Sequence, residues 1–410
     1  MVKNMSKAQI LEGSRAIALT IKNIGPAVVS AYPITPQTHI VEDLARFKAD
    51  GECDFEYARA ESEFAAASII LGASAAGVRV YSSTSSQGLL LMTEVLYNIA
   101  GMRLPVVITC ANRAVSAPIN IWNDQQDVMT IRDAGWILFF AENHQEAVQQ
   151  HILAYKIAEK LQLPVMVNID GFILTHSYEE VAIPTAKEIK KFLPDYKPKA
   201  GTYLDPANPR TFGSFATPAD YLEIRKELHD DLISSLEIIK SEYEKYNKII
   251  PIPNTLLTGQ AGKCQTPNSI DNGLLEYYGP RYAKNIIIAM GSVVGTIKDI
   301  IDEKKSSSGL FGTGVGVLKL KTFRPFPADE IIKTLKIVGA KNIAVVEKAI
   351  SLGNSGPLYI EIKSALQGKL AAGVKNFIVG LGGRDVTKEM IRKIIARTAA
   401  KEKEIEFIGK

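Results

Sequence analysis

Short apolar runs alternate with longer amphipathic segments through the first 170 residues, and this alternation restricts the fold more than any other feature of the 410-residue chain. The apolar runs have the length of strands, and the segments between them repeat their apolar residues at helical spacing. Such alternation is typical of an α/β fold with a doubly wound parallel sheet that carries helices on both faces. We expect strands at 28–31, 55–58, 78–82, 105–111, 137–141 and 164–169, and helices at 8–24, 38–48, 63–75, 88–100 and 145–160.

The remainder of the chain predicts a second, smaller α/β domain. An irregular excursion at 173–215 leads to one long charged helix at 219–248, and residues 249–271, with three prolines and no clear period, indicate a linker or surface insertion. A second alternation begins near Lys284, with strands expected at 285–290, 317–321, 342–346 and 375–379 and helices beginning at Val293, Pro327, Pro357 and Thr387. We therefore divide the chain into a first domain at 1–248, a linker at 249–275 and a second domain at 276–410.

Charge and hydropathy exclude some classes of partner. Lys and Arg total 48 against 44 for Asp and Glu, and no basic stripe is interleaved with aromatic residues, so we expect no nucleic-acid binding. Apolar stretches such as 68–76 are far too short to cross a membrane, and the first residues lead into an amphipathic segment rather than the apolar core of a signal peptide. We expect a cytoplasmic protein without membrane contact.

The isolated cysteines and scattered histidines argue against a metal centre in this chain. An iron–sulfur cluster needs about four thiolates, usually closely spaced, whereas the cysteines lie far apart at Cys53, Cys110 and Cys264. The histidines show neither HExxH nor HxxEH spacing; they are His39, His144, His151, His176 and His229. We therefore expect no cluster and no metal ligands here.

Several polar segments follow predicted strands, where ligands bind in open parallel sheets. Residues 32–38 (YPITPQT) hold Thr35 between two prolines that stiffen the loop and fix its hydroxyl; a rigid turn with Thr38 capping the next helix is the alternative. Glu63 opens a helix of small residues that another molecule could approach closely. Alternatively, its charge simply favours the helix N-terminus.

The next strand ends carry hydroxyl groups and an arginine. Residues 84–88 (TSSQG) could cradle an anion with free N–H groups, or could cap the helix with a hydroxyl. Arg113 directly follows the strand at 105–111, and its guanidinium suits a carboxylate ligand or, equally, a structural salt bridge. Residues 123–127 (NDQQD) predict a polar turn that leads into a helix.

Two glycine-rich runs lack the context of a dinucleotide-binding loop. Residues 312–316 (GTGVG) precede a predicted strand instead of following one. Residues 380–385 (GLGGRD) follow a strand but lack the spacing of the fingerprint, so we interpret them as a tight structural turn.

Together these segments resemble the α subunit of the pyruvate:ferredoxin oxidoreductase family, in its multi-subunit form. The resemblance rests on eight stretches in the family's order that span nearly the whole chain: AYPITPQTHIVEDLA, ESEFAAASIILGASAAGVRVY, TSSQGLLLMTEVLY, AGMRLPVVI, NRAVSAPINIWNDQQD, GFILTH, TFRPFP and FIVGLGGRDVT. Residues 249–271 depart from it, since they are longer than the family's usual connection. The resemblance implies that the first domain is a thiamine-diphosphate-type pyrimidine-binding domain, and that the second is similar to a transketolase C-terminal domain.

The resemblance also implies roles for individual residues. In that family thiamine diphosphate binds between the first domain of the α subunit and a β subunit. Glu63 would be the catalytic carboxylate, which hydrogen-bonds the aminopyrimidine ring so that its exocyclic nitrogen can accept the proton of the thiazolium carbon. Thr35 and Arg113 would hold the substrate. The residues implied in cofactor binding are Glu63, Pro33, Ile34, Ser86 and Gln87.

The implied activity is oxidative decarboxylation of pyruvate with coenzyme A to acetyl-CoA and carbon dioxide, with reduction of ferredoxin. Because the chain has no GDG turn and no cluster cysteines, β, γ and δ subunits are expected to hold Mg²⁺ and the [4Fe–4S] clusters. The PITP and NRAVSAP runs favour pyruvate, with 2-oxoisovalerate or 2-oxoglutarate as alternative substrates. A non-catalytic scaffold subunit is the alternative of another class.

Overall fold

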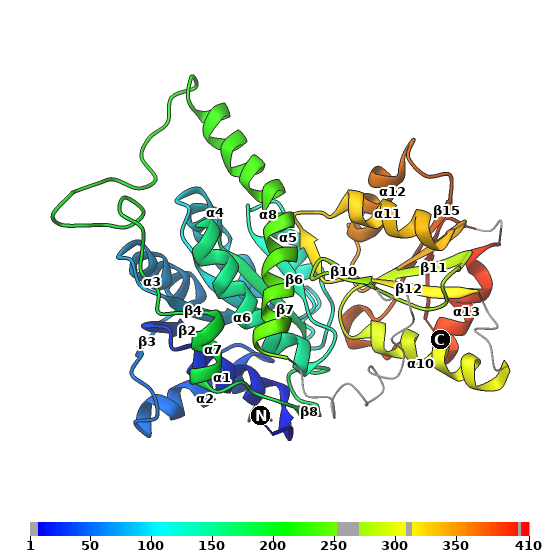
Figure 1. The fold of residues 1–410 in the computed structure, drawn as a ribbon, viewed down its shortest axis with the longest axis horizontal. Coiled ribbons are helices and arrows are strands. Elements are labelled where there is room, and N and C mark those ends of the chain that lie inside the picture. The colour runs from blue at the N-terminus through cyan, green and yellow to red at the C-terminus, as the bar shows by residue number, and fades with distance from the viewer. Residues whose placement is uncertain (1–6, 252–269, 309–313, 401–402, 410) are drawn as a thin grey trace.

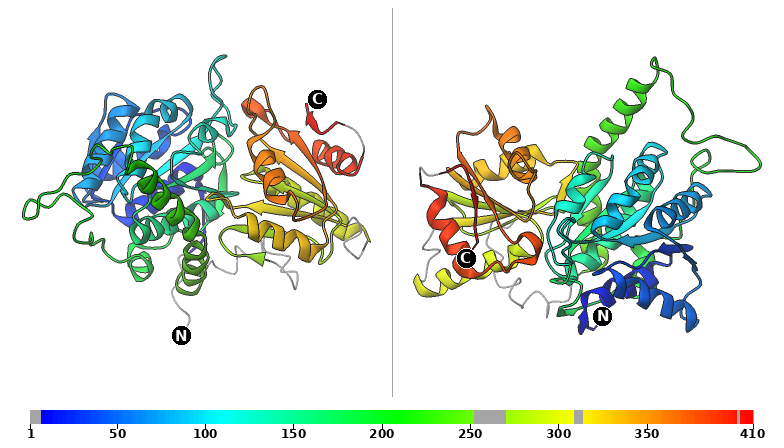
Figure 2. Two further views of the ribbon diagram at one scale, coloured as in Figure 1. Left: turned by 90° about the horizontal axis from the view of Figure 1, so that it is seen from above. Right: turned by 180° about the vertical axis from the view of Figure 1, so that it is seen from behind.

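Two seven-stranded sheets organise the chain into two α/β units that lie side by side (Figure 1). The computed structural model describes residues 7–251, 270–308, 314–400 and 403–409. Figure 2 shows the units as two lobes joined along one boundary. Among the described residues, no helix is both long and apolar enough to span a membrane.

The first sheet is parallel except at one edge, where β13 runs antiparallel to β6. Its order is β13 (Thr322–Arg324), β6 (Ile137–Phe140), β7 (Val165–Asp170), β5 (Val107–Asn112), β4 (Val80–Thr84), β2 (Val28–Ala31) and β3 (Glu56–Arg59). The predicted strands of the first domain therefore lie in one sheet, with bounds within about two residues of those expected from the sequence.

Helices cover both faces of this sheet, as predicted. Alternate strand residues point to opposite faces, so Ile108 of β5 enters one core and Val107 enters the other. Helices α3 (Glu63–Ala75) and α4 (Ser86–Gly101) contribute to the first core. The second core is covered by α1 (Gly13–Ile24), α2 (Thr38–Ala49), α6 (His144–Leu161) and part of α8 (Tyr221–Ile249).

Three short elements of the first unit were not predicted. The expected helix at 8–24 begins only at Gly13, because β1 (Gln9–Glu12) pairs antiparallel with β8 (Tyr178–Val181). The segment at 173–215, expected to be irregular, contains β8 and also α7 (Ala186–Phe192), which begins at a capping box. By contrast, the polar turn at 123–127 does lead into a helix, α5 (Gln126–Thr130), as predicted.

The second sheet confirms the smaller α/β unit. Its order is β16 (Ile405–Phe407), β15 (Gly373–Ile378), β14 (Asn342–Glu347), β11 (Asn285–Ala289), β12 (Val315–Leu320), β10 (Leu275–Tyr278) and β9 (Ile270–Asp271), with the last two antiparallel. Helices α10 (Val293–Ser308) and α13 (Lys388–Thr398) lie against one core, and α11 (Ala328–Val338) and α12 (Pro357–Leu366) against the other. Two of these helices begin at the residues predicted for them, Val293 and Pro357.

A strand that follows β12 in the chain joins the first sheet, and one hydrophobic cluster spans both units. β13 follows β12 in the chain but joins the first sheet, where the Phe140 amide donates to the Lys321 carbonyl at 2.9 Å. One hydrophobic cluster runs from Ile70 and Leu96 of the first unit to Leu275 and Leu358 of the second. The proposed division at 248 and 276 stays a prediction, and most of the expected linker, 252–269, lies outside the described residues.

Candidate active site

The predicted ligand-binding segments gather where the strand order of the first sheet reverses. The chain passes from β2 to β3 at one edge and then crosses back past β2 to β4. Ligands in such sheets bind at this switch point, beyond the carboxyl ends of the two strands. The loop that carries Thr35 follows β2, residues 84–88 end β4 and begin α4, and α3 packs against both strands.

Glu63 is buried at the start of α3 and has no ionic or hydrogen-bond partner among the described residues. Ser62 caps the helix by accepting from the Ala65 amide at 3.1 Å, so Glu63 is the first helical residue. A methyl group at Gly88 of α4 would lie 2.7 Å from Oε1 of Glu63. Only glycine therefore admits the carboxylate at this position. Thr84, whose buried hydroxyl also lacks a partner in the described structure, approaches the same glycine.

The loop after β2 is held in place by a buried glutamine. Gln37 donates through Nε2 to the carbonyl and the hydroxyl of Ser83, both at 2.8 Å, and accepts from the Ile34 amide at 3.3 Å. Thr35 is exposed at the tip of this loop, beside Pro33 and Ile34. Gln37 precedes α2 and Thr38 makes no side-chain cap, so the alternative interpretation of Thr38 as a cap is wrong.

Arg113 connects this loop to the loop after β5. Its Nη1 donates to the Thr35 carbonyl at 2.9 Å, and its Nε donates to the Asn120 carbonyl at 3.0 Å. Burial lowers the pKa of the guanidinium, although the nearby Asp127 carboxylate partly offsets this. Nη2 has no partner among the described residues. Arg113 is thus fixed by two backbone carbonyls, with one donor group remaining.

Asp127, which the sequence analysis placed only in a polar turn, links the loop after β4 to the loop after β5. One carboxylate oxygen accepts from the amides of Ser86 and Arg113, each at 3.0 Å, and the other accepts from Asn112 at 3.0 Å. Burial raises the pKa of Asp127 to about 6, even though these hydrogen bonds favour the ionised form. Asp127 lies between β5 and β6, away from the end of either strand, so no local sequence pattern indicates this role.

Ser86 and Gln87, predicted to contact the cofactor, also lie in this cluster. The Ser86 hydroxyl bonds to the Ala114 carbonyl at 2.5 Å and to Oε1 of Gln87 at 2.6 Å, so it is already used within the chain. α4 has no side-chain hydroxyl cap. The structure thus brings Thr35, Glu63, Ser86, Gln87 and Arg113 into one chain of contacts, while their roles in binding stay predictions.

A buried ion pair at the ends of β7 and β14 joins the two units beside this cluster. Lys348 donates to Asp170 at 2.9 Å and to Asn123 at 3.0 Å. Burial would raise the pKa of Asp170, but the Lys348 ammonium and the Ser292 hydrogen bonds outweigh it and hold the pKa below its ordinary value. Asn123 also bonds to Asp170 at 3.2 Å, so the polar run at 123–127 contributes to the contact between the units.

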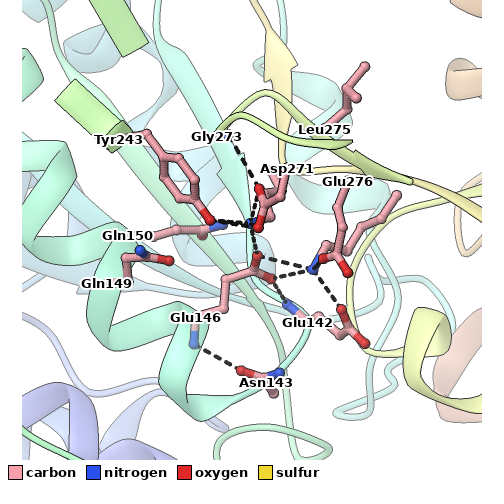
Figure 3. Close-up of polar contacts among 12 residues, drawn as sticks. Glu142, Asn143, Glu146, Gln149, Gln150, Tyr243, Asp271, Gly273, Leu275 and Glu276 are labelled. Atoms are coloured by element: carbon pink, nitrogen blue, oxygen red, sulfur yellow. Dashed lines mark hydrogen bonds and ion pairs between the residues drawn. The ribbon is translucent and has the colours of Figure 1, made fainter. Parts of the chain in front are cut away.

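A second buried ionic network crosses the same boundary. Figure 3 shows Glu142, Glu146, Asp271 and Glu276 directed toward one centre. Three lysines pair with these four carboxylates: Lys298 and Lys319 reach Glu142 at 2.8 and 2.6 Å, and Lys321 reaches Asp271 at 2.8 Å. Burial alone would lower the pKa of Lys319, but the carboxylates raise it well above its ordinary value. With every charge paired inside the chain, this network is structural.

The glycine-rich run at 380–385 forms a structural turn, as predicted. Its short helix η1 (Leu381–Gly383) packs against the polar run of the first unit: the Gly383 amide donates to the Asn123 carbonyl at 2.6 Å, and the Gly382 amide to Asp124 at 3.2 Å. Part of the other run, 312–313, lies outside the described residues.

Comparison with known proteins agrees with this architecture. Residues 20–245 match the family model for the pyruvate flavodoxin/ferredoxin oxidoreductase thiamine-diphosphate-binding domain, and residues 283–391 match that for pyruvate:ferredoxin oxidoreductase core domain II. The chain is 45% identical to pyruvate synthase subunit PorA of Methanocaldococcus jannaschii over 96% of its own length and 95% of that protein. It is 37% identical to ketoisovalerate oxidoreductase subunit VorA of Pyrococcus horikoshii, over 97% of each chain.

A solved structure shares the fold at low sequence identity. A 2-oxoglutarate:ferredoxin oxidoreductase from Magnetococcus marinus, solved with 2-oxoglutarate, coenzyme A and succinyl-CoA bound, superimposes with a TM-score of 0.68 at 20% identity. The match covers 95% of this chain and 66% of that one. The arrangement of the two α/β units is therefore one that known proteins adopt.

Proposed function

This chain belongs to the pyruvate:ferredoxin oxidoreductase family, and we propose that it is the α subunit of an enzyme that oxidises pyruvate to acetyl-CoA and carbon dioxide. Coenzyme A takes the acetyl group, and the two electrons released reduce two molecules of ferredoxin. The observation that carries the proposal is the buried, unpartnered carboxylate of Glu63 at the switch point of the first sheet.

Glu63 has the properties needed to bind the aminopyrimidine of thiamine diphosphate. Glu63 is only 8% exposed and no described residue hydrogen-bonds its carboxylate, so a ligand that covered it would have to supply the hydrogen bond that solvent now provides. A ring nitrogen that carries a proton would supply this bond. When bound, thiamine diphosphate supplies the carbon that attacks the 2-oxo group of the substrate. Glu63 would hold the proton on the ring, and Gly88 would leave the space for its carboxylate.

Thr35 and Arg113 are proposed to bind the substrate. The free Nη2 group of Arg113 can donate to the carboxylate of a 2-oxoacid, while its two other bonds keep the guanidinium in place. The exposed Thr35 hydroxyl lies on the loop that Arg113 fixes. Pro33 and Ile34 on the same loop, with Gln87 beside it, would shape the pocket, and Ser86 would act by holding Gln87.

Partner subunits are proposed to complete the site. A subunit named PorA implies an assembly, and we infer β, γ and δ subunits that hold Mg²⁺, the diphosphate and the [4Fe–4S] clusters. Of the cysteines in the described structure, Cys110 is buried within β5, where burial raises its thiol pKa well above the ordinary value, and Cys53 lies far from it in the sequence. A cytoplasmic location follows from the proposed use of coenzyme A and ferredoxin.

Pyruvate is the proposed substrate because the pyruvate synthase relative is more similar than the ketoisovalerate oxidoreductase relative, at 45% against 37% identity. The test is turnover of the assembled complex with pyruvate and with 2-oxoisovalerate. We expect kcat/KM for pyruvate to be at least about tenfold higher, since one or two methyl groups change binding by about 1–3 kcal/mol. A preference for 2-oxoisovalerate would contradict the assignment.

A Glu63→Gln variant tests the catalytic role against the scaffold alternative. The amide keeps the shape but cannot accept the same charge-assisted bond, and we expect turnover to fall by about 10²-fold or more. Glu61→Gln, two residues earlier and exposed, is the matched control and should leave turnover unchanged. Normal turnover of Glu63→Gln in an intact complex would favour a scaffold.

A further inference from the structure

Three metal-ligating side chains from distant parts of the sequence meet beside the first sheet. Glu12 ends β1, His39 lies in the first turn of α2, and His176 lies in the turn before β8. One carboxylate oxygen and one ring nitrogen of each histidine all lie within 4.8 Å of one another. We propose that Glu12, His39 and His176 form a binding site for one divalent transition-metal ion, with Zn²⁺ the ion best suited to it.

The donor set selects the class of ion. Two imidazoles and one carboxylate suit Zn²⁺ and its first-row neighbours, whereas Ca²⁺ and Mg²⁺ prefer oxygen ligands throughout. Three protein ligands leave a fourth position for water. The sequence predicted no metal ligands in this chain, because these residues are 27 and 137 positions apart and show no local spacing.

The distances require only small movements of exposed side chains. Ligand atoms bonded to a tetrahedral ion at about 2.0–2.1 Å lie about 3.4 Å from one another. Atoms that start up to 4.8 Å apart would each move inward by less than about 1 Å, whereas the Glu12 and His39 atoms, 2.6 Å apart, would separate by about 0.8 Å. His39 and Glu12, hydrogen-bonded at 2.6 Å, are partly exposed and can rotate. Metal binding would replace this hydrogen bond, and the His39 imidazole would carry its proton on the ring nitrogen that does not ligate.

A neighbouring hydroxyl orients His176. Nδ1 of His176 lies 2.6 Å from the Thr175 hydroxyl, which also accepts from the Phe172 amide at 2.8 Å. With Nδ1 donating, Nε2 keeps its lone pair for a metal, which is the usual way that a second contact fixes a ligating imidazole.

The backbone that presents these ligands is rigid. Ser14 donates to the Thr175 carbonyl through its amide at 3.0 Å and its hydroxyl at 2.9 Å. Gly13 passes so close to the same turn that a methyl group would lie 1.8 Å from the Leu174 carbonyl oxygen. The bound ion would therefore tie the start of α2 to this turn, and so brace the loop that carries Thr35.

The test is Zn²⁺ binding by the purified full-length chain without an affinity tag, measured by calorimetry, with Co²⁺ absorption as a probe of the ligands. We expect one ion per chain, binding at least about tenfold weaker in His39→Ala and in Glu12→Gln, and unchanged in the control His229→Ala, whose histidine is exposed on α8. Zn²⁺ should also raise the thermal midpoint by about 3 °C or more in the wild type, but not in His39→Ala.

Both variants change partly exposed side chains, so circular dichroism should show an intact fold. Equal Zn²⁺ affinity in the wild type and in both variants would place the ion elsewhere and overturn the proposal. Failure of the wild-type chain to bind more Zn²⁺ than His39→Ala would overturn it too. Neither result bears on the proposed oxidoreductase activity, which Glu63→Gln tests separately.

Discussion

Substitution of Gly88 by alanine should disable the proposed site while leaving the fold intact. The added methyl group would lie 2.5 Å from the Thr84 hydroxyl, 2.7 Å from Oε1 of Glu63 and 2.8 Å from its Cγ. Carbon–oxygen and carbon–carbon contacts need about 3.4 Å or more, so the Glu63 side chain must move by roughly 0.6–0.7 Å and the Thr84 hydroxyl by roughly 0.9 Å.

For Gly88→Ala we expect a small loss of stability and a large loss of turnover. Overpacking costs about 1–3 kcal/mol, while alanine in place of a helical glycine returns up to about 1 kcal/mol, so the loss of stability should be about 0–2 kcal/mol. A displacement near 1 Å of a catalytic group costs about 10²-fold in rate. We therefore expect Gly88→Ala to assemble with its partners and to lose about 10²-fold in turnover with pyruvate.

Gly101→Ala is the matched control in the same helix. No atom outside the helix backbone lies within 4 Å of the methyl group it would add. Its stability should rise slightly and its turnover should not change. The assay is ferredoxin reduction by the reconstituted complex, with the urea unfolding midpoint measured in parallel. If Gly88→Ala keeps turnover within about threefold of Gly101→Ala, the reasoning that places the Glu63 carboxylate at the reacting centre is refuted.

Three further predictions follow from buried charges. Burial raises the pKa of Glu347 to about 7 from an ordinary 4.5, so the folded chain keeps this proton to higher pH than the unfolded chain does. The free energy of unfolding should therefore fall by about 3 kcal/mol as the pH rises from 4.5 to 7. Glu347→Gln should reduce this pH dependence in urea unfolding, and an unchanged pH dependence would contradict the prediction. Lys348→Met should cost about 3–5 kcal/mol in the same assay because it leaves the Asp170 carboxylate buried without its cation, whereas exposed Lys341→Met should cost nothing measurable. Arg113→Lys keeps the charge but loses the planar fork that spans the two carbonyls and a substrate, so kcat/KM for pyruvate should fall about 10- to 100-fold in steady-state kinetics; normal kinetics would place the substrate carboxylate elsewhere.

Helices and strands whose apolar residues repeat regularly within one continuous segment were predictable from the sequence. β2 and α3 have the bounds expected from hydrophobic spacing, because each buries an apolar run that is continuous in sequence. β1 and β13 were missed because four and three residues carry too little periodicity. They are strands only because partners distant in sequence, β8 and β6, offer an edge with which to pair.

The candidate site divides in the same way. Thr35, Glu63 and Arg113 each lie at or near the carboxyl end of a predicted strand, and parallel strands bring such ends together, so their proximity could be inferred. Asp127 accepts hydrogen bonds from the Ser86 and Arg113 amides only because the chain that follows β5 folds back toward both loops. No spacing along the chain encodes that path, and the same holds for the cluster of Glu12, His39 and His176.

The antiparallel pairing of β13 with β6 has a consequence for how the protein unfolds. A chain shortened to the first unit would leave β6 as an open sheet edge with unpaired backbone groups, and would expose the apolar side chains that both units bury together. Neither half has a complete interior when isolated. The two units should therefore melt in a single cooperative transition, and fragments expressed separately should aggregate unless both halves are present in one cell.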